Sequence, residues 1–228
     1  MESVGYRVYF EEAGQGIPLL CRYTAGSDGR QYRHLLENSE ITEHFRVIAA
    51  DLPYRGKSLP PFGLRWWEQE YKLTADFFKT FILAMSEALE LDQPVFMGCS
   101  MGGHLAADLA LNHPDRFRAC IALEGALESH AIQGVMAWWN HPRLGNDSKP
   151  SLVYTETAQD IDTGQVGFYV LSGEYDWSAY PEAREALARK VKGSQYTLMR
   201  RMGHFSMSEN PVEFTDYLRP VLDEIRSR

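Results

Sequence analysis

The sequence lacks the features that mark several large classes of protein. Its unbroken apolar runs fall far short of the roughly 18 residues that a membrane-spanning helix needs. Its 31 acidic residues outnumber the 23 basic ones, for a formal net charge of −8, which argues against a nucleic-acid partner because phosphate binding needs a basic surface. The first residues hold neither a basic region nor an apolar segment, so we expect no secretory signal peptide, no membrane partner and a cytoplasmic location.

Signatures of bound metals and nucleotides are also missing. The three cysteines, Cys21, Cys99 and Cys120, show no C-x-x-C spacing, and we interpret them as buried free thiols in a reducing compartment. No group of ligand-type side chains has the spacing of a metal site, and no glycine pattern suits a dinucleotide or a P-loop phosphate. We therefore expect no metal and no cofactor.

The sequence does contain a regular alternation of apolar runs and helical stretches. At 228 residues and 44% hydrophobic composition, the chain is long enough for one domain with a sizeable core. Short apolar runs predict buried strands over residues 17–23, 45–50, 95–98, 119–123, 166–171 and 196–199. Helical stretches are predicted over residues 29–37, 74–91, 101–112, 181–192 and 212–225. Strands that alternate with helices predict an α/β fold, with a mostly parallel sheet covered on both faces.

Three segments need separate interpretation. Residues 1–16, in which Tyr6, Val8 and Phe10 alternate with polar residues, predict a β-hairpin. Residues 125–165 break the alternation, and we interpret them as a short lid inserted into a core made of residues 1–124 and 166–228. The charged helix over residues 181–192 is predicted to present its acidic and basic side chains to solvent.

The rest of the chain is organised around residues 98–103, with the sequence GCSMGG. An apolar run ends at Gly98 and a helical stretch begins after Ser100, which predicts a strand, a sharp turn and a helix with the serine at the tip. A serine hydroxyl is a poor nucleophile unless it is exposed and held against a base. Because the tight turn strains the serine backbone, small residues are needed two positions before and after it, where Gly98 and Gly102 stand.

The serine pattern alone is weak, and its value depends on partners further along the chain. Asp176 and His204 each follow a predicted strand, as Ser100 does. Active sites in parallel sheets lie at the carboxyl ends of the strands. We therefore expect these three side chains to meet at one edge of the sheet.

With these motifs the sequence resembles the α/β-hydrolase fold family nearly from end to end. Residues 98–103 resemble the family's nucleophile turn, and residues 51–58 (DLPYRGKS) resemble its D-x-x-x-x-G-x-S turn. Residues 173–176 (GEYD) resemble the loop of the acid, and residues 203–205 (GHF) with 209–211 (ENP) resemble the loop of the histidine. The order Ser, Asp, His is also that of the family. The resemblance implies a mostly parallel sheet of the eight-stranded type, helices on both faces and a short lid.

The resemblance also implies roles for the site residues. Ser100 would attack an acyl carbon, His204 would take the serine proton, and Asp176 would hold the imidazole tautomer and stabilise its charged form. The backbone N–H groups of Met101 and, by position, Ala25 would form the oxyanion hole.

Alternatives remain at several of these positions. Glu124 follows the strand after the nucleophile helix and is a rival acid or a pocket-lining residue, and Trp138 and Trp139 are further candidates to line the pocket. The sequence also departs from the family: Tyr23-Thr24 stands where His-Gly is usual, and Arg22 is an unusual end to a buried strand.

The serine favours acyl chemistry, because relatives that open haloalkanes or epoxides carry aspartate at that position. We expect a hydrolase that cleaves a small carboxylic ester or lactone through an acyl-serine intermediate, with a small-molecule acyl substrate as partner. The alternatives are a carbon–carbon bond hydrolase that cleaves a diketone with the same triad, and a catalytically weak ligand-binding member of the fold. The sequence does not distinguish a monomer from a homodimer.

Overall fold

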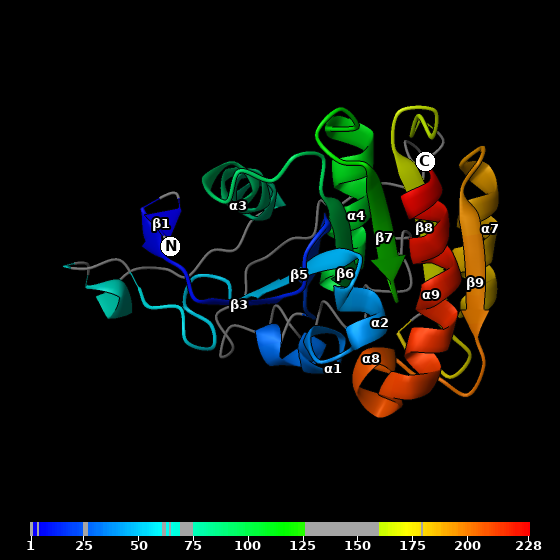
Figure 1. Ribbon diagram of the computed structural model, residues 1–228, viewed down its shortest axis with the longest axis horizontal. Helices are drawn as coiled ribbons and strands as arrows, with labels where there is room; N and C mark the ends of the chain where they lie inside the picture. Colours follow the sequence, from blue (N-terminus) through cyan, green and yellow to red (C-terminus); the bar gives the residue numbers. More distant parts are fainter. Residues whose placement is uncertain are drawn as a thin grey trace.

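A computed structural model describes residues 2–3, 5–24, 27–60, 63, 65–68, 75–125, 160–178 and 180–228. In these residues seven strands form one sheet in the order β3-β5-β4-β6-β7-β8-β9 (Figure 1). The strands are β3 (Phe10–Ala13), β4 (Ile17–Arg22), β5 (Phe45–Ala50), β6 (Val95–Cys99), β7 (Ala119–Leu123), β8 (Gly167–Gly173) and β9 (Gln195–Met199). All neighbours are parallel except β3 and β5, so the predicted mostly parallel α/β sheet is confirmed, with seven strands in the described part of the chain.

The central strands are apolar on both faces because helices cover both. Every residue of β6, β7 and β8 is buried, as expected for parallel strands between two helical layers. Helix α4 (Met101–Asn112) packs against β6 and β7, and α3 (Ala75–Ala88) contacts α4. Helix α9 (Pro211–Ser227) contacts α1 (Arg33–Leu36). Figure 1 shows α9 in front of the sheet, with α4 and α7 (Pro181–Lys190) behind it.

Short elements complete the described chain. They are β1 (Glu2–Ser3), β2 (Tyr6–Arg7), the 3-10 helices η1 (Gly29–Tyr32) and η2 (Trp66–Glu68), α2 (Ser39–Thr42) and α8 (Ser206–Glu209). Among the described residues, none of the helices is long and apolar enough to cross a membrane. The predicted lid lies almost wholly outside the described residues, since residues 126–159 are not among them.

The N-terminal hairpin is smaller than predicted. Residues 2–3 pair with residues 6–7, whereas β3 pairs antiparallel with β5 at the edge of the main sheet. The prediction of one hairpin over residues 1–16 is therefore wrong after residue 7. Alternating side chains identify a half-buried strand, but they do not say which strand lies beside it. A bond from the Asp51 amide to the carbonyl of Tyr9 (2.9 Å) continues this pairing beyond the end of β5.

The cysteines are free and buried, as predicted for Cys21, Cys99 and Cys120. Burial raises the pKa of each thiol above its ordinary value, because the thiolate would lose its hydration. These thiols therefore act as small apolar groups in the core.

Candidate active site

The predicted nucleophile lies in a strained turn between β6 and α4. Ser100 has φ 57° and ψ −112°, and residues other than glycine rarely adopt such a positive φ. Its amide donates to the carbonyl of Leu123 (2.8 Å), and its carbonyl accepts from the amide of His104 (3.1 Å). A side chain at Gly98 would collide with the backbone of Gly102, which explains the small residues of the motif.

Met101, a predicted oxyanion donor, lies at the start of α4. Met101 is its first residue, where an amide has no partner within the helix and faces outward along the helix dipole. The other predicted donor, Ala25, lies outside the described residues, as do Trp138 and Trp139. The neighbouring Thr24 is described: its amide donates to Oε1 of buried Gln31 (3.0 Å).

The predicted acid and histidine meet in the structure. Asp176 follows β8 and His204 follows β9, and Nδ1 of the histidine lies 3.0 Å from Oδ1 and 3.1 Å from Oδ2 of the aspartate. The two loops are also joined by a bond from the Tyr175 amide to the carbonyl of Met202 (2.8 Å). The thiol of Cys99, next to Ser100, lies 3.5 Å from the carbonyl of His204. The serine turn and the histidine loop are therefore neighbours at the carboxyl edge of the sheet.

The aspartate is held in its charged form. Its side chain is fully buried, and burial alone would raise its pKa. The hydrogen bond from His204 and the charge of Arg184 outweigh burial and lower the pKa of Asp176 below its ordinary value. A carboxylate beside Nδ1 leaves Nε2 of the same ring unprotonated and able to accept a proton.

Glu124 lies behind the aspartate. It sits just after β7 with φ 49° and is 1% exposed. Both carboxyl oxygens lie 2.9 Å from the amide of Gly173, and Oε2 lies 3.2 Å from Nη1 of Arg184. Among the described residues, the carboxyl group that contacts the His204 ring is Asp176.

Arg184 contradicts the prediction of a fully solvated charged helix. It is 1% exposed and extends from α7 between the carboxylates of Asp176 and Glu124. The prediction holds for Arg189 on the same helix, whose side chain is 75% exposed and bonds Glu185 (2.6 Å). A charged helix does not reveal in its own sequence which of its cations meets a buried carboxylate.

Glu209 holds the histidine loop. Its carboxylate accepts the amide of Gly203 (2.6 Å) and that of Phe205 (2.9 Å), one on each side of His204. A Cβ at Gly203 would lie 2.8 and 2.9 Å from the two carboxylate oxygens, which explains the glycine before the histidine. The motif contained Glu209, but this role was not predicted.

The unusual residues at the end of β4 are built into the core. Arg22 donates to the carbonyl of Tyr23 (2.5 Å), and its guanidinium lies 4.1 Å from the Tyr23 ring centre and 5.3 Å from that of Phe78. The Tyr23 hydroxyl accepts the amide of Leu52 (2.6 Å). A Cβ at Gly102 would lie 2.7 Å from the carbonyl of Arg22. Arg22 and Tyr23 therefore pack between the nucleophile helix and the turn after β5.

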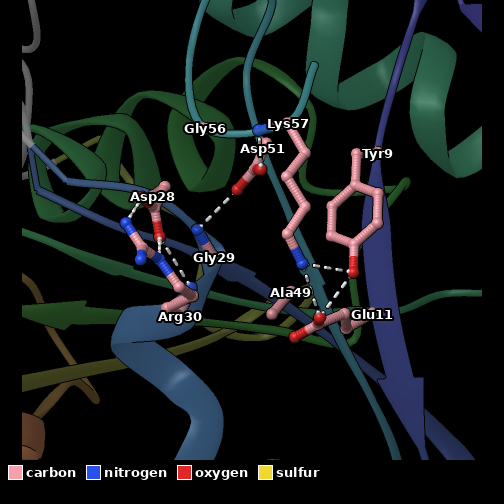
Figure 2. Close-up of a pocket in the computed structure, with 9 residues that line it drawn as sticks. All are labelled: Tyr9, Glu11, Asp28, Gly29, Arg30, Ala49, Asp51, Gly56 and Lys57. Atoms are coloured by element: carbon pink, nitrogen blue, oxygen red, sulfur yellow. Dashed lines mark hydrogen bonds and ion pairs between the residues drawn. The ribbon is translucent and has the colours of Figure 1, made fainter.

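A pocket of about 240 Å³ lies beside that turn, and most of the residues that line it are polar or charged (Figure 2). Its charged groups already have polar partners: Asp51 accepts the backbone amides of Gly29 and Lys57 (both 2.7 Å), and the Lys57 ammonium lies 2.8 Å from the Tyr9 hydroxyl. None of the predicted catalytic residues lines it. The Asp51 contacts explain the D-x-x-x-x-G-x-S motif as a structural turn.

Two aromatic rings lie against the histidine. Trp177 follows the acid directly and lies 5.1 Å from His204 between ring centres, at an interplanar angle of 47°. Phe205 lies 5.0 Å away, edge to face. The Trp177 side chain is 65% exposed. The pair lowers the access of water to the imidazole on two sides.

The fold and the site geometry agree with the class of proteins that the motifs resemble. The sequence profile of the family described as alpha/beta hydrolase fold matches residues 23–147, more than half of the chain. The chain therefore belongs to the α/β-hydrolase fold family.

Known relatives share part of this chain. A 2-hydroxymuconate semialdehyde hydrolase of Pseudomonas sp. (strain CF600) is 28% identical over 141 residues, which are 61% of this chain and 47% of that protein. The chain spans about half the length, or less, of the curated relatives it matches.

Solved structures cover more of the chain at lower identity. A thermophilic esterase from Thermogutta terrifontis has a TM-score of 0.77 and 21% identity, over 96% of this chain and 94% of the esterase. The enol-lactonase from Burkholderia xenovorans LB400 has a TM-score of 0.75 and 19% identity, over 99% of this chain and 98% of the lactonase. At these identities the comparison establishes the fold alone.

Proposed function

We propose that this chain is a serine hydrolase that cleaves a small carboxylic ester or lactone through an acyl-serine intermediate. The observation that carries the proposal is the strained turn of Ser100, located at the same sheet edge as the contact between Asp176 and His204. A serine in such a turn, next to the loop of a histidine whose other nitrogen meets a carboxylate, is suited to acyl transfer.

In the proposed mechanism, His204 acts through its two ring nitrogens. Nδ1–H donates to Asp176, and Nε2 accepts the Ser100 proton as the hydroxyl oxygen attacks the acyl carbon. The imidazolium then protonates the leaving alcohol, or the ring oxygen of a lactone. In the second half of the cycle His204 takes a proton from water as the water oxygen attacks the acyl carbon, and the imidazolium then returns that proton to the Ser100 oxygen as the acid leaves.

The oxyanion of each tetrahedral intermediate would lie at the N-terminus of α4. The amide of Met101 begins this helix, and the helix dipole favours negative charge there. We propose Ala25 as the second donor, on its position after β4. Each such donor lowers the barrier by about 3 kcal/mol in comparable sites.

A second candidate function is hydrolysis of a carbon–carbon bond. It is supported by the 28% identity to a 2-hydroxymuconate semialdehyde hydrolase. The same serine, histidine and aspartate would then act on a ketone carbon, and the leaving group would be a carbon rather than an oxygen. A ligand-binding role without turnover is a third candidate, and it requires that Ser100 be unreactive.

The test is turnover of p-nitrophenyl esters of increasing acyl length by the natural chain and by Ser100→Ala. We expect ester hydrolysis that falls at least ~1,000-fold in the variant, because the acyl-enzyme can no longer form. The acyl length with the highest kcat/KM would measure the pocket. A variant that keeps full activity would refute the acyl-serine route.

Two further measurements distinguish the other candidates. Loss of absorbance from 2-hydroxymuconate semialdehyde without ester hydrolysis would favour carbon–carbon cleavage. Labelling of Ser100 by a fluorophosphonate reports a reactive serine whatever the substrate. Neither turnover nor labelling would favour the ligand-binding role.

A further inference from the structure

Arg184 is the most deeply buried charge that the proposed mechanism leaves unexplained. It reaches from α7 to the back of the Asp176 carboxylate, with Nη2 2.5 Å from Oδ2. Burying a guanidinium costs several kcal/mol unless good geometry and hydrogen bonds compensate. The chain provides that compensation at one place, directly behind the acid.

Four further contacts fix the guanidinium. Nη1 donates to Ser172 Oγ (2.9 Å) and to Glu124 Oε2 (3.2 Å). Nη2 donates to Ser178 Oγ (2.9 Å) and to the carbonyl of Glu124 (3.2 Å). These partners come from β8, the acid loop and the end of β7, so Arg184 ties three elements to α7.

The contacts define the orientation of the acid. Arg184 binds Oδ2 of Asp176, and the amide of Ser178 binds Oδ1 (2.7 Å). With one donor on each oxygen, the carboxylate cannot rotate without losing a bond, and both oxygens stay near Nδ1 of His204. Ser178 Oγ also lies 3.2 Å from the same ring nitrogen.

The contacts also set the charge behind the histidine. Burial raises the pKa of Glu124 well above its ordinary value, against the opposing charge of Arg184. Asp176 therefore carries the negative charge, and the guanidinium balances it from the far side. The positive charge of Arg184 thus helps to keep Asp176 ionised.

We propose that Arg184, anchored by Glu124, is a positioning residue of the proposed reaction: it fixes the Asp176 carboxylate and balances its negative charge. The catalytic role of Arg184 rests on the proposed function, whereas its electrostatic effect on Asp176 and His204 does not. Other titratable groups near the pair are His104 on α4, Cys99 on β6 and Glu209 on α8, and none of them is changed in the test below.

The experiment measures the pKa of His204 by NMR titration of its ring, and kcat and KM for an ester, in Arg184→Lys and Arg184→Met. The signal is assigned by its loss in His204→Asn. Arg189→Met, in which an exposed cation of the same helix is removed, is the control. Circular dichroism and a melting curve show whether each variant is folded.

The two variants separate charge from geometry. Arg184→Met removes the charge that balances Asp176, and we expect the His204 imidazolium to be favoured, so that the acid limb of kcat/KM moves to higher pH. Arg184→Lys keeps the charge but not the two-pronged geometry, and we expect an unchanged His204 pKa with a kcat about tenfold lower and a similar KM. Arg189→Met should match the natural chain in both.

The electrostatic and catalytic results can fail separately. A folded Arg184→Met with an unshifted His204 pKa would overturn the electrostatic part, and Arg184→Lys with unchanged kcat would overturn the positioning part. If Arg184→Met does not fold, Arg184→Lys still decides the positioning part, and Arg184→Gln takes the place of Arg184→Met in the titration. If no ester is turned over, the His204 pKa still tests Arg184, so failure of the proposed function is distinguished from failure of this inference.

Discussion

At the scale of single residues, the position of His204 depends on the carboxylate of Glu209. That carboxylate binds the backbone on both sides of the histidine. Charge-assisted bonds to backbone amides are about twice as strong as neutral ones. A side chain that is itself exposed thus fixes a buried one.

We expect Glu209→Leu to fold and to lower kcat about 10- to 100-fold, because the freed loop lets the imidazole shift away from the serine. The measurement is kcat and KM for the best p-nitrophenyl ester. Glu87→Leu, which breaks an exposed ion pair with Arg116, is the control. Equal activity in the two variants would show that the loop needs no carboxylate.

Single residues also mark the limit of prediction from sequence. The sharp turn of Ser100 and the contact between Asp176 and His204 could be predicted, because each residue stands in a local motif after a strand. Arg184 could not, because Arg184 and Arg189 both stand in the charged sequence of one helix. Arg184 is buried because it contacts the carboxyl groups of Asp176 and Glu124. Glu124 lies 60 residues away in the chain, and no local pattern encodes such a contact.

At the scale of elements, η1 connects two parts of the site. Gln31 accepts the amide of Thr24 on one side and lies 3.3 Å from Met207 Sδ of α8 on the other. Thr24 directly precedes Ala25, the proposed second oxyanion donor. The short helix thus holds the loop after β4 against the helix that follows the histidine.

We expect Gln31→Leu to lower kcat about tenfold with little change in KM, because the unpaired Thr24 amide would let the neighbouring donor move. Leaving a buried amide without a partner should also lower the free energy of unfolding by about 1–3 kcal/mol. Both are measured by ester kinetics and urea unfolding. Gln15→Leu, at an exposed glutamine, is the control, and the same kcat in both variants would contradict the role of Gln31.

Elements were predicted well where burial alone decides them. Residues 45–50 and 119–123 are strands with the predicted bounds, since a strand covered on both faces needs a mostly apolar run. The partner of β3 could not be predicted. Its side chains are half-buried or exposed, and the pairing with β5 joins segments more than 30 residues apart.

At the scale of the whole molecule, the two buried carboxyls give stability opposite dependences on pH. The folded-state pKa of Asp176 is lowered from 3.8, so its contribution is present above that value and is lost as the pH falls further. The folded-state pKa of Glu124 is raised from 4.5. The folded protein therefore binds a proton there more tightly than the unfolded chain, and stability falls as the pH rises from 4.5 toward the raised value.

Glu124→Gln removes this second dependence. The amide oxygen can still accept from Gly173 and Arg184, but the group no longer ionises. We expect the free energy of unfolding of Glu124→Gln, relative to the natural chain, to be larger at pH 8 than at pH 5 by about 1 kcal/mol or more, since each pKa unit corresponds to about 1.4 kcal/mol. Urea unfolding at both pH values, with a reductant to protect the thiols, measures it.

Glu87→Gln is the matched control, because Glu87 is exposed and its difference from the natural chain should be the same at pH 5 and pH 8. The histidines are common to all three proteins, so their contribution cancels in the comparison. A Glu124→Gln difference that stays constant would mean that Glu124 keeps its charge in the fold. In that case Arg184 would balance two carboxylates rather than one, and the His204 imidazolium would be stabilised by a net negative charge.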